Sequence, residues 1–66
     1  MVKNANRIRV LRAERSISQY DAAAGLAMSF NRFWRIEKGY TDPTEDEKKQ
    51  IAQFFGRRVR EVFEAA

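Results

Sequence analysis

Apolar residues recur at helical spacing from the beginning of the chain, and their intervals predict where the helices lie. Within residues 4 to 15, Ala5, Ile8 and Leu11 fall on one side of a helical wheel. Arginines occupy the remaining sides, at positions 7, 9, 12 and 15. The segment is therefore predicted to form an amphipathic helix with a basic outer surface.

Capping signals divide the next part of the chain into two short helices. Ser18, with Asp21 three residues later, has the form of a helix N-cap, and the helix after it is expected to end near residue 25 or 26. Ser29 is a second N-cap candidate, and Gly39 suits the left-handed residue that follows a helix. A third helix is therefore expected at about residues 29 to 38.

The C-terminal part of the chain predicts two more helices. Thr44 and Glu47 form a capping-box pattern, so a fourth helix should begin at residue 45 and end at Gly56. Its apolar residues are Ile51, Ala52, Phe54 and Phe55, and those of the fifth helix are Val59, Val62 and Phe63. No segment alternates between apolar and polar residues as a strand does. The sequence therefore predicts an all-α fold of five helices.

Composition narrows the classes of function that the chain can perform. Its 66 residues predict one domain over residues 1–66, and they include no Cys and no His. Disulfides, thiolate or imidazole metal sites and the usual bases of hydrolytic enzymes are thereby excluded. We expect neither enzymatic activity nor a cofactor, metal or small-molecule ligand. No apolar run is long enough for a signal peptide or a membrane span, so a cytoplasmic location is expected.

Positive charge is concentrated in the first two-thirds of the chain. Residues 1–40 carry eight Lys and Arg against three acidic residues (+5), whereas residues 41–66 carry five against six (−1). Such a distribution favours a polyanionic partner, but a merely solvated basic surface would have the same composition. The positions of the basic residues have to decide between these two interpretations.

A set of residues from the second to the fifth helix resembles the signature of the phage-repressor/Cro-type (xenobiotic-response-element-like) helix-turn-helix family. The matching positions are Ile17-Ser18-Gln19, Ala23, Leu26, Met28-Ser29, Arg35 to Gly39, Pro43, Ile51-Ala52, Phe55-Gly56 and Val62-Phe63. The resemblance implies a five-helix lambda-repressor-like DNA-binding domain, with its helix-turn-helix in the second and third helices. It also implies a phage or prokaryotic transcriptional regulator.

The same resemblance assigns roles to individual residues. Gln19 corresponds to a position that contacts a DNA phosphate, and Arg12 and Glu37 correspond to a pair that forms a buried ion pair in some members. The third helix corresponds to the recognition helix. Further phosphate contacts are expected near its two ends, from Ser29, Lys38, Tyr40 and Thr41.

The helical wheel of the third helix gives an independent prediction of its outward side. Phe33 and Ile36 point towards the core, so Asn31, Trp34, Arg35 and Lys38 point outwards. Asn can form a bidentate pair with adenine and Arg with guanine, which makes Asn31 and Arg35 candidate readers of bases. Arg32 lies more to the side, where a phosphate contact is expected.

Phe30 and Trp34 stand one turn apart where the family usually presents polar residues to the DNA. They are candidates for contact with thymine methyl groups, for sideways packing within the protein, or for an apolar patch that binds another protein. The first two interpretations together are favoured. The third would make the domain a protein-interaction module, for example one that binds a polymerase subunit, a toxin or another regulator.

Other positions depart from the family pattern. Ala27 replaces the usual glycine of the turn, so we expect the turn to be reshaped, with Gly25 as the flexible residue. Ala22 and Phe33 are a smaller and a larger residue than usual, and we expect them to compensate for each other in volume. Arg57 and Arg58 precede the fifth helix in place of a capping residue, which opens a further phosphate or partner contact.

The main functional prediction is a DNA-binding regulator that reads an operator half-site and acts as a homodimer. One domain reads only half of a palindromic site, so a second copy is expected one turn of DNA away. The predicted dimer surface lies on the last two helices and consists of Phe54, Val59, Val62 and Phe63. All four residues are also candidates for the core.

Overall fold

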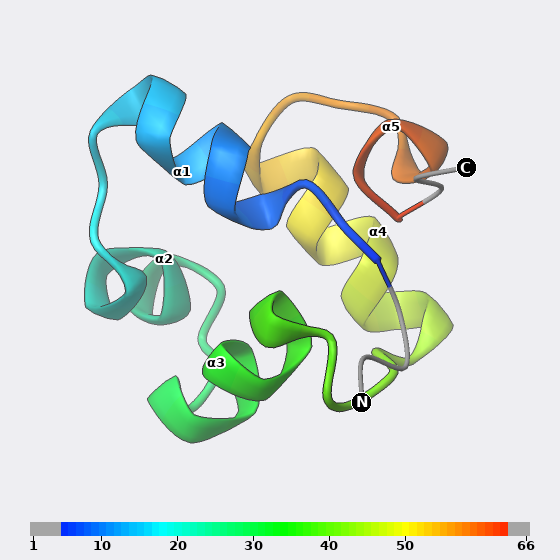
Figure 1. Ribbon diagram of the computed structural model, residues 1–66, viewed down its shortest axis with the longest axis horizontal. Helices are drawn as coiled ribbons and strands as arrows, with labels where there is room; N and C mark the ends of the chain where they lie inside the picture. The colour runs from blue at the N-terminus through cyan, green and yellow to red at the C-terminus, as the bar shows by residue number, and fades with distance from the viewer. Residues whose placement is uncertain (1–4, 64–66) are drawn as a thin grey trace.

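The computed structural model describes residues 5–63, which form five helices and contain no strand (Figure 1). The helices are α1 (Ile8–Arg15), α2 (Gln19–Gly25), α3 (Phe30–Lys38), α4 (Glu45–Phe54) and α5 (Val59–Phe63). The prediction of an all-α fold with five helices is confirmed. None of these helices combines the length and apolar character that crossing a membrane requires.

The helices surround one hydrophobic core. In Figure 1, α2 and α3 lie side by side, α5 lies next to α4, and α1 lies above α2 and to the left of α4. Every helix contributes to the core, which consists of Ile8, Leu11, Ala22, Ala23, Leu26, Phe33, Ile36, Ile51, Ala52, Phe55 and Val62. Burial of apolar side chains from all five helices is the main contribution that holds so short a chain together.

The helix starts follow local capping chemistry. The hydroxyl groups of Ser18, Ser29 and Thr44 each accept a hydrogen bond from the backbone N–H three residues later. At Thr44 the carboxylate of Glu47 also accepts the Thr44 N–H, which completes the capping box. These three N-caps agree with the sequence prediction because they depend only on residues within one turn.

The first helix begins later than its apolar spacing predicted. Asn6 donates from its side chain to the carbonyl of Ile36, and the N–H of Arg7 donates to the carbonyl of Val62. These two bonds hold the residues before Ile8 against α3 and α5 instead of in a helix. Ala5 lies outside the helix and is exposed, so its predicted place on the apolar side was wrong.

The turn between α2 and α3 is strained at the position where the sequence lacks glycine. Ala27 has φ of 54°, in the left-handed region that costs an L-residue roughly 1–2 kcal/mol. The prediction that Gly25 would take over this role was wrong, because Gly25 is helical. A Cβ at Gly25 would lie 2.5 Å from the ring of Phe54, so this glycine makes room for the Phe54 side chain against α2.

A buried ion pair connects α1 to α3. The guanidinium group of Arg12 donates to both carboxylate oxygens of Glu37, at 2.7 and 2.9 Å, and also to the carbonyl of Ile17. The side chain of Glu37 is 2% exposed. Gln19, at the start of α2, donates to the same carboxylate at 3.2 Å. One carboxylate therefore joins three helices, and Arg12 also holds the segment between α1 and α2.

We predict that Ala27→Gly stabilises the protein. The substitution removes the left-handed strain, and the greater freedom of glycine in the unfolded chain offsets part of the gain, so the free energy of unfolding should rise by about 0.5–1 kcal/mol. Ala24→Gly, at an exposed helical position, is the matched control and should lower it by about 1 kcal/mol. Urea denaturation measures the free energy of unfolding of both variants. Equal destabilisation by the two variants would show that Ala27 is unstrained.

We also predict that Arg12→Ala lowers the free energy of unfolding by about 3–5 kcal/mol, because it leaves the buried carboxylate of Glu37 without its charged partner. Replacing both residues with methionine should recover most of this loss, since no charge then stays buried. Denaturation monitored by circular dichroism compares the two variants. A double variant as unstable as Arg12→Ala would contradict the account.

Candidate nucleic-acid interface

Helix α3 presents a polar outer side while its inner side is fixed in the core. Phe33, Ile36 and Glu37 are buried, whereas Asn31 and Arg35 are exposed, as the helical wheel placed them. Lys38 is exposed as well. Within residues 5–63, the side chains of Asn31, Arg35 and Lys38 make no hydrogen bond or ion pair. Their donors are therefore available to a ligand.

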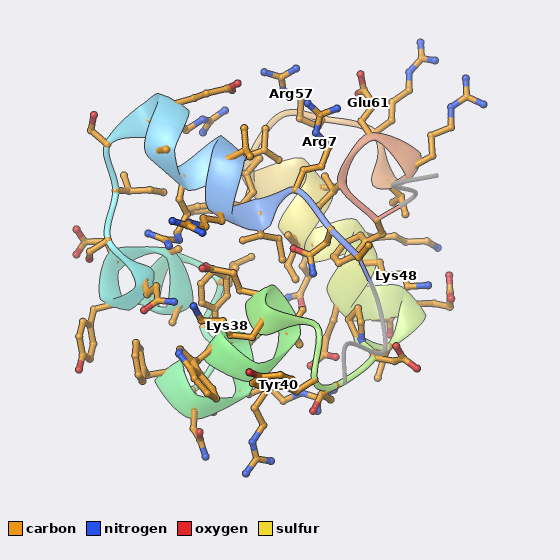
Figure 2. The ribbon with its side chains drawn as sticks, in the orientation of Figure 1. Arg7, Lys38, Tyr40, Lys48, Arg57 and Glu61 are labelled. Carbon is orange, nitrogen blue, oxygen red and sulfur yellow. The ribbon has the colours of Figure 1, made fainter. Side chains whose placement is uncertain are left out.

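The end of α3 carries a tight reversal that brings the next residues back over the helix. Gly39 has φ of 82°, and the N–H of Tyr40 donates to the carbonyl of Arg35 at 2.9 Å. Figure 2 shows Lys38 and Tyr40 on the side of the molecule formed by α3. Tyr40 is 48% exposed, and Thr41 is half-buried. The predicted contact residues at this end of α3 thus lie close to its outer side.

Phe30 and Trp34 pack sideways against other aromatic residues and not into the core. The ring of Phe30 stacks on Tyr20 of α2, with centroids 4.2 Å apart and planes at 12°. Trp34 meets the ring of Tyr40 edge to face at 5.6 Å. Neither Phe30 nor Trp34 belongs to the core cluster or packs against it, and both keep part of their surface exposed.

Tyr20 is the member of this surface that the sequence analysis missed. It is 68% exposed, and it lies in the first turn of α2, as Phe30 does in α3. An aromatic residue on each of two consecutive helix starts is the signal that could have indicated the stack. The spatial relation of the two helices was needed to interpret it.

Arg32 is directed towards α4, which differs from its predicted role at a phosphate. Its Nε and Nη2 donate to the two carboxylate oxygens of Glu47, at 3.0 and 2.7 Å. These hydrogen bonds lower the pKa of the Glu47 carboxyl and raise the pKa of Arg32. The capping box of α4 holds Glu47 within reach of α3, so the lateral guanidinium has an acidic partner inside the protein.

Two further residues that were predicted to contact phosphates, Gln19 and Ser29, lie at the starts of α2 and α3. Gln19 is the first residue of α2, and its amide nitrogen is engaged with Glu37. Ser29 is exposed, and its hydroxyl oxygen caps α3 by accepting the N–H of Arg32. Both side chains are thus held in place by bonds within the protein.

The opposite side of the molecule carries arginines that are interspersed with acidic residues. Figure 2 shows Arg7, Arg57 and Glu61 near α5, away from Lys38 and Tyr40. Arg57 forms an ion pair with Glu14 at 3.1 Å. The N–H of Arg58 donates to Glu61 at 2.7 Å, which caps α5 and lowers the pKa of the Glu61 carboxyl. The cap that the sequence lacked before α5 is therefore supplied by Glu61.

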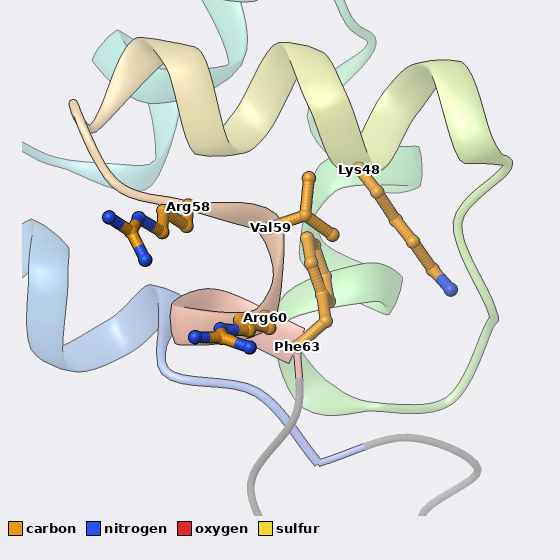
Figure 3. A pocket seen from close by; sticks show the side chains of 5 residues that line it. All are labelled: Lys48, Arg58, Val59, Arg60 and Phe63. Atoms are coloured by element: carbon orange, nitrogen blue, oxygen red, sulfur yellow. The ribbon is translucent and has the colours of Figure 1, made fainter.

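The predicted dimer residues divide into core and surface. Val62 is fully buried, so its place in a dimer interface was wrong: α5 turns this side chain inwards. Phe54, Val59 and Phe63 pack against the core and stay partly exposed. Val59 and Phe63 line an open hollow of about 470 Å³, and Figure 3 shows them between Lys48 on one side and Arg58 and Arg60 on the other.

The chain is similar to two known proteins, and each match extends over 58 residues. Over 58 residues, or 88% of the chain, it is 31% identical to the cryptic phage CTXphi transcriptional repressor RstR of Vibrio cholerae. It is 34% identical over 58 residues to an uncharacterized HTH-type transcriptional regulator of Methanocaldococcus jannaschii. No protein-family model matches the chain.

The two relatives differ in how much of their own length is matched. The chain spans about half of the Vibrio repressor, 52% of its length, but 88% of the archaeal regulator. The second match covers 88% of each of the two sequences. The five-helix chain belongs to the family of HTH-type (helix-turn-helix) transcriptional regulators.

Proposed function

We propose that this protein is a sequence-specific DNA-binding transcriptional regulator, with α2 and α3 as its helix-turn-helix and α3 as the helix that enters the major groove. The observation that carries the proposal is the outer side of α3, where Asn31, Arg35 and Lys38 are exposed and have no partner within residues 5–63. The names of both relatives, a phage repressor and a transcriptional regulator, support it.

Each of these side chains has a definite task in the proposed complex. Arg35 suits the two acceptors of guanine, and Asn31 suits the donor and acceptor of adenine. Lys38, Tyr40 and Thr41 at one end of α3, with Gln19 and Ser29 at the helix starts, contact phosphates and fix the orientation of the helix. Arg32 stays in this set as a lateral phosphate contact, made through the guanidinium N–H groups that its bonds to Glu47 leave free.

The rest of the structure favours this side as the nucleic-acid interface over the cationic side near α5. Around α5, arginines are interspersed with Glu14 and Glu61, whose charges would repel phosphates. Arg35 and Lys38 of α3 are exposed and have no acidic partner within the described residues. The α3 side is therefore the more favourable one for a polyanion.

A second copy of the chain completes the proposed operator complex. The Cα atoms span 26 Å along the longest axis, less than the roughly 34 Å between successive major grooves on one side of DNA. One copy therefore reads one half-site. We propose a homodimer that meets through the exposed parts of Val59 and Phe63. Phe54, the other partly exposed residue of the predicted surface, lines a separate hollow with Gly25 and Leu26.

DNA binding by this interface should weaken steeply with salt. For several phosphate contacts, we expect affinity to fall roughly tenfold to a thousandfold between 50 and 200 mM salt, because bound cations are released from the DNA. Fluorescence anisotropy, with duplexes selected from a random pool, measures the affinity at each salt concentration. Failure to bind any duplex at 50 mM salt would overturn the proposed function and would favour a protein partner for the exposed aromatic residues.

Two variants of exposed residues should separate base contacts from phosphate contacts. Arg35→Ala is expected to cost about 1–3 kcal/mol on the selected sequence and to relax the preference at one base pair. Lys38→Ala should weaken all duplexes alike and reduce the slope of the salt dependence by about 1. A uniform loss with both variants would show that Arg35 reads no base.

Dimerisation through α4 and α5 should become stronger as the salt concentration rises, whereas DNA binding becomes weaker. Lys48, Arg58 and Arg60 border the apolar hollow, so two copies bring like charges together, and salt screening favours their association. Analytical ultracentrifugation should show a dimer that Phe63→Ser disrupts and that Val10→Ser, at an exposed position on α1, does not. A dimer unaffected by Phe63→Ser, with the fold intact by circular dichroism, would place the interface elsewhere.

A further inference from the structure

We propose that the stacked pair Tyr20–Phe30 makes this protein selective for thymine, through its 5-methyl group, at the base pair that faces the start of α3. The proposal rests on the function proposed above and names the feature of DNA that these aromatic residues recognise. Phe30 supplies the contact, and Tyr20 is a positioning residue that holds the ring of Phe30 in place.

The position of Phe30 on α3 directs its ring towards the DNA end of the helix. Phe30 is the first residue of α3, directly after the N-cap Ser29. Side chains on a helix lean towards its N-terminus, so this ring extends beyond the first turn. In the helix-turn-helix arrangement, the N-terminal residues of the recognition helix are those that contact base edges.

The stack on Tyr20 holds the ring at the surface. The centroids lie 4.2 Å apart with an interplanar angle of 12°, so one side of the Phe30 ring is covered, while Phe30 as a whole stays partly exposed. A ring already held in one rotamer loses little conformational entropy on binding. Because Phe30 is outside the core cluster, this arrangement contributes little to the hydrophobic core.

The chemistry of a phenyl ring limits what it can distinguish in the major groove. Phe30 has no hydrogen-bonding group, and the thymine methyl is the apolar group that base edges display there. A ring at this position therefore favours thymine over cytosine, whose edge presents an amino group. Trp34, one turn further along α3 and in contact with Tyr40, continues the apolar surface beside Asn31 and Arg35.

A protein partner is the competing use of the same apolar surface. The unpaired polar side chains on the same helix argue for DNA, because Asn31 and Arg35 lie within one turn of the two aromatic residues. A partner protein that covered the rings would also have to cover these donors and supply acceptors for them. The major groove displays apolar methyl groups and acceptors together.

The test replaces thymine with deoxyuridine, which removes the methyl group and leaves the base-pairing edge unchanged. A duplex selected from a random pool is synthesised in both forms, and their affinities for the full chain are compared by anisotropy. We expect about fourfold weaker binding for each contacted methyl, from the transfer free energy of one methylene-sized group. Single replacements then locate the base pair that faces Phe30.

Variants of Tyr20 and Phe30 test whether the loss of affinity on removal of the methyl group arises from the aromatic pair. With the single replacement at the base pair that faces Phe30, Phe30→Ser should bind the duplexes with and without the methyl group equally well, and so should Tyr20→Ala, whereas Tyr20→Phe retains the stack and should retain the preference. Val10→Ser, an exposed apolar position on α1, is the control for general effects and should also retain it. Circular dichroism establishes that each variant is folded.

The outcomes separate this proposal from the one on which it rests. Binding to selected duplexes with no loss on removal of the methyl groups overturns methyl recognition and leaves DNA binding intact. A loss that persists unchanged in Phe30→Ser assigns the effect to DNA shape or to another residue, and it also overturns the proposal. If no duplex binds, the proposed function itself fails.

Discussion

The carboxylate of Glu37 is the point on which the arrangement of the first three helices depends. It is buried near the end of α3, it accepts two hydrogen bonds from Arg12 of α1, and it accepts a third from Gln19 of α2. A buried charge is tolerated only where such partners surround it, so α1 and α2 have to meet α3 at this place. The network fixes the angle at which α3 presents its outer side.

The aromatic residues of α2 and α3 illustrate how a small domain keeps apolar side chains on its surface. Phe30 and Trp34 lie on the outer side of a helix whose inner side is already filled by Phe33 and Ile36. They are covered in part by Tyr20 and Tyr40, which do not belong to the core. The cost of exposure is thus reduced locally, and the rings stay available to a ligand.

The two sides of the molecule differ in how their charges are satisfied. Near α5, Arg57 and Glu14 form an ion pair, and Glu61 caps the helix. Near α4, Glu47 serves both the capping box and Arg32. On α3, Asn31, Arg35 and Lys38 have no such partner in the described part of the chain. The outer side of α3 therefore combines exposed, unpaired donors with no acidic partner among the described residues.

The sequence by itself determined the features that depend on neighbouring residues. The N-caps at Ser18, Ser29 and Thr44 and the left-handed Gly39 follow from bonds within one turn, so their residue types indicate them directly. The inward positions of Phe33 and Ile36 follow from helical periodicity. Local patterns along the chain are therefore sufficient to predict the five helices and the outer side of α3.

Only the tertiary structure decided the features that join residues distant in the chain. The position of Asn6 and Arg7 depends on bonds to α3 and α5, and the stack of Phe30 on Tyr20 depends on how α2 meets α3. The ring of Phe54 against Gly25 accompanies a turn in which Ala27 takes the strained conformation. Such contacts have no local signal, because their energies arise from packing between helices and not from the residues on either side.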